Sequence, residues 1–206
     1  MSNLPAIASA SRLAVQQQRE MLEVFTSFES SNRYVVRAAD GQVALYAAES
    51  GGGALAFLTR SFLKAKRPFT MHVLRPGGGV ALTLRRPWNW FFSELRVDDE
   101  RGQPLGMIDQ RFALFARRFV ILGPGGEALA ELHGPWFRPW TFRIMRGGQE
   151  LGKITKQWSG LLKEAFTDAD NFGLELGPAM EPQLRTLALA ATFLIDFLYF
   201  EDSNRR

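Results

Sequence analysis

Apolar and polar residues alternate along the middle of the chain, from Asn32 to Trp158, with the period of two that is typical of β-strands. Gly-rich turns interrupt this alternation repeatedly, and a run of strand length flanks each turn on both sides. The runs form these pairs: 34–39 with 43–48, 69–74 with 80–84, 95–97 with 105–108, 119–122 with 128–132, and 142–145 with 151–154. With a further strand at 172–176, the pattern predicts a mainly β protein of about ten to twelve antiparallel strands. The dipeptide Asp40-Gly41, between the first two runs, is favoured in hairpin turns of two residues.

The C-terminal segment, residues 181–201, is apolar nearly all round and is predicted to be an α-helix. Fifteen residues lie between Arg185 and Glu201, and at about 1.5 Å per residue they reach about 22 Å, short of the roughly 30 Å hydrocarbon core of a bilayer. An ionised Asp196 would add about 3 kcal/mol to the cost of insertion. We therefore expect the helix to be buried inside its own protein, with these residues in the core: Leu187, Leu189, Phe193, Leu194 and Phe197.

A sheet of twelve strands leaves long unpaired edges unless it closes into a barrel. The lumen of such a barrel is too wide for the strands' own side chains to fill, and the C-terminal helix has a suitable size to fill it. The sequence therefore predicts a closed antiparallel barrel that encloses the helix.

The N-terminal part is predicted to contain a disordered segment, residues 1–11, and a helix over residues 11–28. Ser11 is a suitable N-cap, and apolar residues such as Leu13 and Phe25 follow at helical spacing. Residues 12–201 are expected to form a single domain, with a polar tail at 202–206.

The composition narrows the possible functions. The net charge of +4 and the pI near 9.8 favour anionic partners such as acidic phospholipids. The absence of cysteine excludes disulfides, thiolate metal sites and palmitoylation. The first residues lack the charged start and the apolar run of a secretion signal, so we expect a cytoplasmic protein. No arrangement typical of a catalytic triad or of a phosphate-binding loop is present, and we expect a protein that is not an enzyme.

Several long motifs resemble the phospholipid scramblase family, over nearly the whole chain from Gln16 to Glu201. The most specific are GKITKQWSG at 152–160, KEAFTDADNFG at 163–173 and FLIDF at 193–197. The resemblance implies a tubby-like fold, a closed barrel of twelve strands around a hydrophobic helix. It also implies calcium-dependent, bidirectional and non-selective movement of phospholipids between bilayer leaflets, which members either mediate or regulate. This sequence lacks the family's Pro-rich N-terminal extension and its palmitoylated cysteine cluster, near whose position it has PWNWFF at 87–92.

The segment from Asp168 resembles the calcium loop proposed for the family. Calcium needs six to eight oxygen ligands, which Asp168, Asp170 and Glu175 would supply in part. Phe172 and Ala179 occupy positions where a liganding oxygen is wanted, so any site here should bind calcium weakly. The alternative interpretation is an Asp-rich turn before a strand.

Aromatic and basic residues cluster near the predicted end of one hairpin and indicate a lipid-binding site. The candidate residues are Arg85, Arg86, Trp88, Trp90, Phe91 and Phe92. A second cluster lies at 136–140. The alternative interpretation is that Trp88, Trp136 and Trp158, which occupy equivalent positions after their hairpins, belong to the core. Lys153, Lys156 and Lys163 are interpreted as a solvated strand edge.

Taken together, these patterns predict a protein that binds anionic phospholipids at the inner face of the plasma membrane and mediates or regulates their calcium-dependent movement across it. The alternative is a soluble barrel that acts as a lipid-sensing or protein-interaction adaptor without scrambling activity. We do not expect nucleic acid as a partner, because a net charge of +4 is small for that role. The sequence does not identify protein partners.

Overall fold

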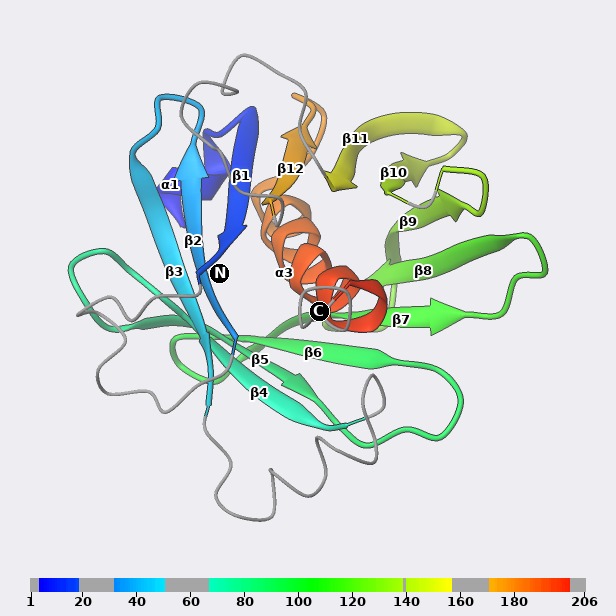
Figure 1. The fold of residues 1–206 in the computed structure, drawn as a ribbon, viewed down its shortest axis with the longest axis horizontal. Coiled ribbons are helices and arrows are strands. Elements are labelled where there is room, and N and C mark those ends of the chain that lie inside the picture. Colours follow the sequence, from blue (N-terminus) through cyan, green and yellow to red (C-terminus); the bar gives the residue numbers. More distant parts are fainter. Residues whose placement is uncertain (1–3, 19–31, 51–66, 139, 157–170, 201–206) are drawn as a thin grey trace.

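The computed structural model describes residues 4–18, 32–50, 67–138, 140–156 and 171–200, which form one closed barrel of twelve antiparallel strands around a helix (Figure 1). The strands are β1 (Arg12–Gln17), β2 (Arg33–Ala38), β3 (Val43–Glu49), β4 (Phe69–Leu74), β5 (Val80–Arg86), β6 (Glu94–Asp99), β7 (Pro104–Arg111), β8 (Ala116–Leu122), β9 (Ala128–Pro135), β10 (Thr141–Arg146), β11 (Gln149–Lys156) and β12 (Asn171–Leu176). Two helices are described, α1 (Pro5–Ala8) and α3 (Pro182–Tyr199). The predicted fold class is confirmed.

The five hairpins predicted from the alternating pattern are all present, with successive strands paired in sequence order. The first turn differs from the prediction. Four residues, 39–42, lie between β2 and β3, and the Ala38 backbone N–H donates to the Gln42 carbonyl at 2.9 Å. Gly41 adopts a φ of +82° within this turn, a conformation that favours glycine.

Strand β1 closes the barrel, because it pairs antiparallel with both β2 and β12. Leu13 lies opposite Ala38 on one side and Leu174 on the other. The sequence predicted a helix over residues 11–28, and this is wrong for Arg12–Gln17; residues 19–28 lie outside the described part. Helical spacing of apolar residues is a weak signal here, since the two open sheet edges supply backbone partners that outweigh it.

The segment before β1 also differs from the prediction, which was disorder over residues 1–11. Pro5–Ala8 form the short helix α1, with proline at a first-turn position, where its missing N–H costs nothing. Leu4 and Ile7 are buried in the main core, and Ile7 is fully enclosed. Arg185 of α3 donates to the carbonyl of Ala10, which joins this segment to the central helix.

Helix α3 fills the lumen, as predicted, and runs through the ring of strands (Figure 1). Every residue from Leu184 to Phe197 is buried, including the five core residues named from the sequence, Leu187, Leu189, Phe193, Leu194 and Phe197. Asp196 is accommodated by a hydrogen bond of 2.7 Å that the Tyr34 hydroxyl donates to its Oδ2. A buried polar group needs such a partner, which Tyr34 supplies from the barrel wall.

The close fit between helix and wall depends on a glycine in β7. Gly106 has a φ of +151°, and a Cβ atom built there would lie 2.3 Å from the Leu122 carbonyl oxygen and 2.9 Å from Cδ1 of Leu187. Only glycine therefore allows β7 to approach both β8 and α3 at this point.

The strands alternate in direction, so their connections alternate between the two ends of the barrel. Helix α3 begins at one end, where Gln183 donates to the carbonyl of Leu105 at 2.7 Å. It finishes at the other, where Gln110 donates to the Tyr199 hydroxyl at 3.2 Å. We call the end where α3 begins the lower rim and the end where it finishes the upper rim.

Candidate membrane-binding site

The connection between β5 and β6, residues 87–93, lies on the upper rim and exposes three aromatic side chains. Phe91 is 90% exposed, Trp90 is 69% exposed and Phe92 is 45% exposed. The base of the loop is held firmly, because Arg86 donates to Ser93 Oγ at 2.9 Å. A fixed base with protruding apolar tips is typical of a surface that contacts another phase or molecule.

The remaining lipid-binding candidates occupy different environments. Trp88 is half-buried and packs edge-on against Trp90, with 5.5 Å between ring centroids. Arg85 is exposed and forms an ion pair with Asp98. Arg86 is buried, donates to the carbonyl of Arg67 and is therefore wrong as a lipid-contacting residue. The alternation of the strand explains this, since Arg86 is two residues after the buried Leu84 and points to the same face.

A second aromatic loop joins β9 to β10 on the same rim. It exposes Trp136, Phe137 and Trp140, of which Phe137 is 82% exposed. The interpretation of Trp136 as a core residue is wrong, because β9 ends at Pro135 and the tryptophan lies beyond the strand pairing. Trp158 lies outside the described residues.

A third exposed loop, between β7 and β8, was missed by the sequence reasoning. Its residues Phe112, Leu114 and Phe115 are all exposed, and Phe115 is 83% exposed. A signal was present in the run FALF at 112–115, which connects two strands without any glycine or other turn-forming residue. A connection between two strands normally contains polar or turn-forming residues. An apolar connection therefore indicates a surface that contacts another molecule or a membrane.

Four cations surround the last turn of α3 just inside the upper rim. Arg67 and Arg86 lie 4.6 and 5.0 Å from the Phe197 ring centroid, Arg117 lies 4.2 Å from that of Tyr199, and Lys156 lies 4.2 Å from that of Phe200. Positive charge near a helix C-terminus is stabilising, and each cation also gains from the aromatic face.

Two of the side chains around the end of α3, Arg67 and Tyr199, are affected by ion pairing and by burial respectively. Arg67 forms a buried ion pair with Glu49. Burial raises the pKa of Tyr199 to about 12, so its hydroxyl stays protonated at neutral pH.

Two of the three lysines that were interpreted as a solvated strand edge lie in the described part of the chain, and they differ in how far they are exposed to solvent. Lys156 is buried, with its ammonium over the Phe200 ring, so that interpretation is wrong for this residue. Lys153 is partly exposed and forms an ion pair with Glu175, at 3.3 Å between Nζ and Oε2. Lys163 lies outside the described residues.

Of the three residues proposed for calcium, only Glu175 is described. It lies on β12, and its carboxylate is engaged by Lys153. Asp168 and Asp170 lie outside the described residues. Within the described part of the chain, no group of three or more His, Asp or Glu side chains is arranged to hold a metal ion.

Arg118, Glu131 and His133 form a hydrogen-bonded group on the described surface. Glu131 accepts from Arg118 at 2.7 Å and contacts His133 Nε2 at 2.8 Å. These two hydrogen bonds, that from Arg118 first, lower the pKa of Glu131. A carboxylate held in its charged form in this way suits an ion pair rather than a proton-transfer role.

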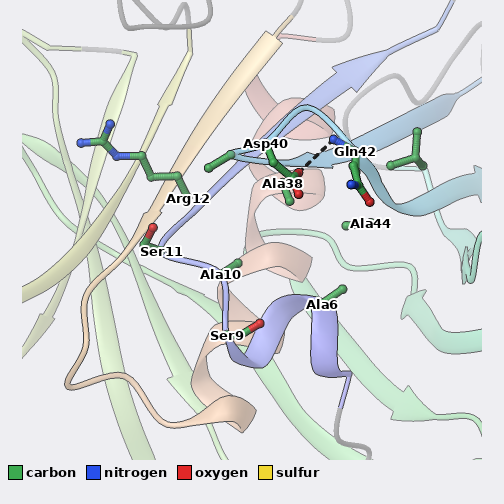
Figure 2. A pocket seen from close by; sticks show the side chains of 11 residues that line it. Ala6, Ser9, Ala10, Ser11, Arg12, Ala38, Asp40, Gln42 and Ala44 are labelled. Atoms are coloured by element: carbon green, nitrogen blue, oxygen red, sulfur yellow. Dashed lines mark hydrogen bonds between the residues drawn. The ribbon is translucent and has the colours of Figure 1, made fainter.

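A hollow of about 420 Å³ lies on the lower rim between α1 and the β2–β3 turn (Figure 2). Small side chains such as Ala6 and Ala44 form much of its lining. Figure 2 shows Arg12 extended away from Asp40, whose Oδ1 accepts from the Gln42 backbone N–H at 3.0 Å. The charged groups of this hollow therefore do not converge on a common point.

Among the described residues, neither helix combines the length and the hydropathy that crossing a membrane would require.

The fold has a counterpart among solved structures. A crystallised protein from Arabidopsis thaliana superimposes with a TM-score of 0.52, covering 98% of both chains at 13% sequence identity. This similarity supports the class of the fold, a closed barrel with a helix in its lumen.

Comparison with known sequences identifies the family to which the chain belongs. The family model described as Scramblase matches residues 1–202. Mouse phospholipid scramblase 1 is 32% identical over 96% of this chain and 63% of its own length, and the human protein of the same name is 30% identical over 98% and 66%. A phospholipid scramblase family protein of Schizosaccharomyces pombe is 32% identical over 84% of this chain and 48% of its own length. The chain belongs to the scramblase family, and it spans slightly less than two thirds of the length of these mammalian relatives.

Proposed function

We propose that this protein binds anionic phospholipids at a membrane surface and mediates or regulates their calcium-dependent, bidirectional movement between the leaflets. Relatives named phospholipid scramblases, similar over nearly all of this chain, support the proposal. The single observation that carries it is the exposed β5–β6 loop, with Trp90, Phe91 and Phe92 in solvent. Tryptophan and phenylalanine at such a position suit the headgroup region of a bilayer.

The filled lumen of the barrel favours lipid binding on the outer surface of the protein. Leu187, Phe193 and Leu194 of α3 are fully or almost fully buried against the wall, so side chains occupy the lumen. Protein interiors are close-packed, which argues against a binding site for an acyl chain between α3 and the described strands. The proposal therefore places phospholipid contact on the outer surface of the protein and requires no bond-making chemistry from it.

The proposal also includes a place of action. We infer peripheral association with the inner face of the plasma membrane, from the cytoplasmic side, where anionic lipids are concentrated. Exposed arginines such as Arg138 would add electrostatic attraction of about 1 kcal/mol each near such a surface. This attraction decays over about 8 Å at physiological ionic strength, so binding should weaken with added salt.

Calcium enters the proposal as a weakly bound ion at Asp168 and Asp170, with Glu175 as the third ligand. Because Glu175 is paired with Lys153, the ion must displace the ammonium, and a dissociation constant of roughly 10⁻⁴ to 10⁻³ M is expected. Replacement of both aspartates by alanine should abolish the binding measured by calorimetry. Submicromolar binding, or binding unaffected by the double substitution, would exclude this site.

A scrambling assay tests the proposed function. Fluorescent phosphatidylserine is placed in one leaflet of protein-containing vesicles, and its exposure to an impermeant quencher is followed with and without calcium. We expect loss of leaflet asymmetry that depends on protein and increases with calcium, and that falls when Trp90, Phe91 and Phe92 are changed to serine. An unchanged asymmetry, with the protein folded and bound to the vesicles, would refute scrambling by this chain.

The filled lumen favours one second candidate, a lipid-sensing or protein-interaction adaptor without scrambling activity. An adaptor should bind anionic vesicles reversibly and leave lipid asymmetry unchanged at every calcium concentration. The same assay therefore separates the two candidates.

A further inference from the structure

The three aromatic loops of the upper rim belong to consecutive hairpins. Their connections, 87–93, 112–115 and 136–140, follow β5, β7 and β9, so strand alternation brings all three to the same end of the barrel. Four strand spacings separate the first connection from the third, or about 19 Å along the sheet at about 4.8 Å per strand. The loops are thus successive neighbours along one arc of the upper rim.

Each loop presents one aromatic side chain almost completely to solvent. Phe91, Phe115 and Phe137 are 90%, 83% and 82% exposed. On the lower rim, by contrast, the described turns contain no large exposed hydrophobic side chain. Because single exposed apolar residues are common but a cluster confined to one end is not, this arc indicates an interaction surface.

The charges of the described connections differ between the two ends. On the upper rim these connections contain no carboxylate, and their exposed cation is Arg138, because Arg67 is buried and paired with Glu49. On the lower rim they contain the acidic residues Asp40, Glu100, Glu127 and Glu181 and the basic residues Arg75 and Arg101. An anionic surface would therefore attract the upper rim and favour it over the lower.

The arrangement of the three loops favours a bilayer, rather than a second copy of the chain, as the partner of this surface. Three separate protruding loops do not form the closely packed, continuous patch that a stable protein interface requires. A fluid bilayer adapts to separate tips, and tryptophans such as Trp90, Trp136 and Trp140 suit its headgroup region.

The geometry points to a three-loop platform, formed by residues 87–93, 112–115, 136–138 and 140, that docks on an anionic bilayer with the C-terminal end of α3 facing the membrane. This inference rests on the proposed membrane function and deepens it. It adds the β7–β8 and β9–β10 loops to the contact and sets the orientation, because three points of contact fix a plane. The barrel axis then stands roughly along the membrane normal.

Because the chain contains no cysteine, a single introduced cysteine carries one environment-sensitive fluorophore. The labelled positions are Phe91→Cys, Phe115→Cys and Phe137→Cys on the upper rim, and Glu127→Cys on the lower rim as the control. Each protein is mixed with vesicles of phosphatidylserine and phosphatidylcholine in equal parts, and with vesicles of phosphatidylcholine alone. We expect a blue shift of the emission at all three upper positions with the anionic vesicles and none at the control.

A loop variant adds a measure of affinity. Phe112→Ser with Phe115→Ser should weaken vesicle binding by about tenfold or more, since two large apolar side chains leave the contact. Its thermal unfolding should match that of the parent, because both side chains are exposed.

Other results of these labelling and binding experiments would each contradict a different part of the proposal. A blue shift at Phe91→Cys alone would leave docking by a single hairpin and refute the platform, while a shift at Glu127→Cys would refute the orientation. Shifts that need no vesicles and grow with protein concentration would indicate self-association. A parent protein that binds no anionic vesicle would contradict both the platform and the proposed function, whereas normal docking without lipid movement would contradict only the scrambling activity.

Discussion

Leu194 tests whether the apolar helix is a core element of the barrel. The residue is fully buried in the second half of α3, and the surrounding wall is held by an uninterrupted ring of strand pairs. Such a wall collapses poorly around a lost side chain, so Leu194→Ala should cost about 4 kcal/mol, in the upper part of the usual range. For a chain of this size that corresponds to a fall in Tm of about 8 to 16 °C.

Leu194→Arg should have a larger effect, because it adds a buried charge without a partner. The expected cost is comparable to the whole stability of about 5 to 15 kcal/mol that a domain of this kind possesses, so the variant should not fold. The matched control is Leu114→Arg, since Leu114 is 72% exposed on the upper rim and the same substitution there should leave Tm nearly unchanged. Thermal and urea unfolding followed by circular dichroism measure both. A folded Leu194→Arg variant with the Tm of its parent would show that α3 is not enclosed.

Three further substitutions examine single contacts. Gly106→Ala should lower the stability by about 1 to 3 kcal/mol, because its Cβ would approach the Leu122 carbonyl to 2.3 Å; an unchanged Tm would contradict this close approach. Tyr34→Phe removes the hydroxyl that donates to Asp196 and should cost about 1 to 2 kcal/mol in urea unfolding, whereas equal midpoints would show that the bond contributes nothing. Glu181 accepts from Arg146, which holds its pKa near 2 against an ordinary 4.5, so its contribution is present above pH 4.5 and is lost as the pH falls toward 2. The pair is exposed, so Glu181→Gln should cost only about 0.5 kcal/mol at pH 7, and a difference from the parent that persists at the acidic end of this range would refute the assignment.

The barrel was predictable because its signals are local and repeated. Each hairpin combines a period of two with a glycine turn, and the strand count then requires closure. Strand β1 was not predictable in this way, since Arg12–Gln17 becomes a strand only when the edges of β2 and β12 approach it from distant parts of the sequence. The burial of Leu4 and Ile7 depends on the same closure.

The candidate site was predicted in part. The run at 87–92 breaks the strand pattern, and Trp90 and Phe91 are exposed as that break suggests. Arg86 was misplaced because it continues the inner face of β5 two residues after Leu84, and Trp136 was misplaced because β9 ends one residue before it.

The pairing that closes the barrel has a consequence for biosynthesis. Leu13 and Leu174 are neighbours in space, yet almost the entire chain separates them, and α3 follows β12 in the sequence. Since a ribosome releases the N-terminal strands first, β1 waits for its second partner until β12 has been synthesised. During that interval the nascent sheet has open edges and an apolar inner face without the helix that covers it. Contacts of such long range also fold slowly, so this chain should depend on chaperones during synthesis more than its modest size suggests.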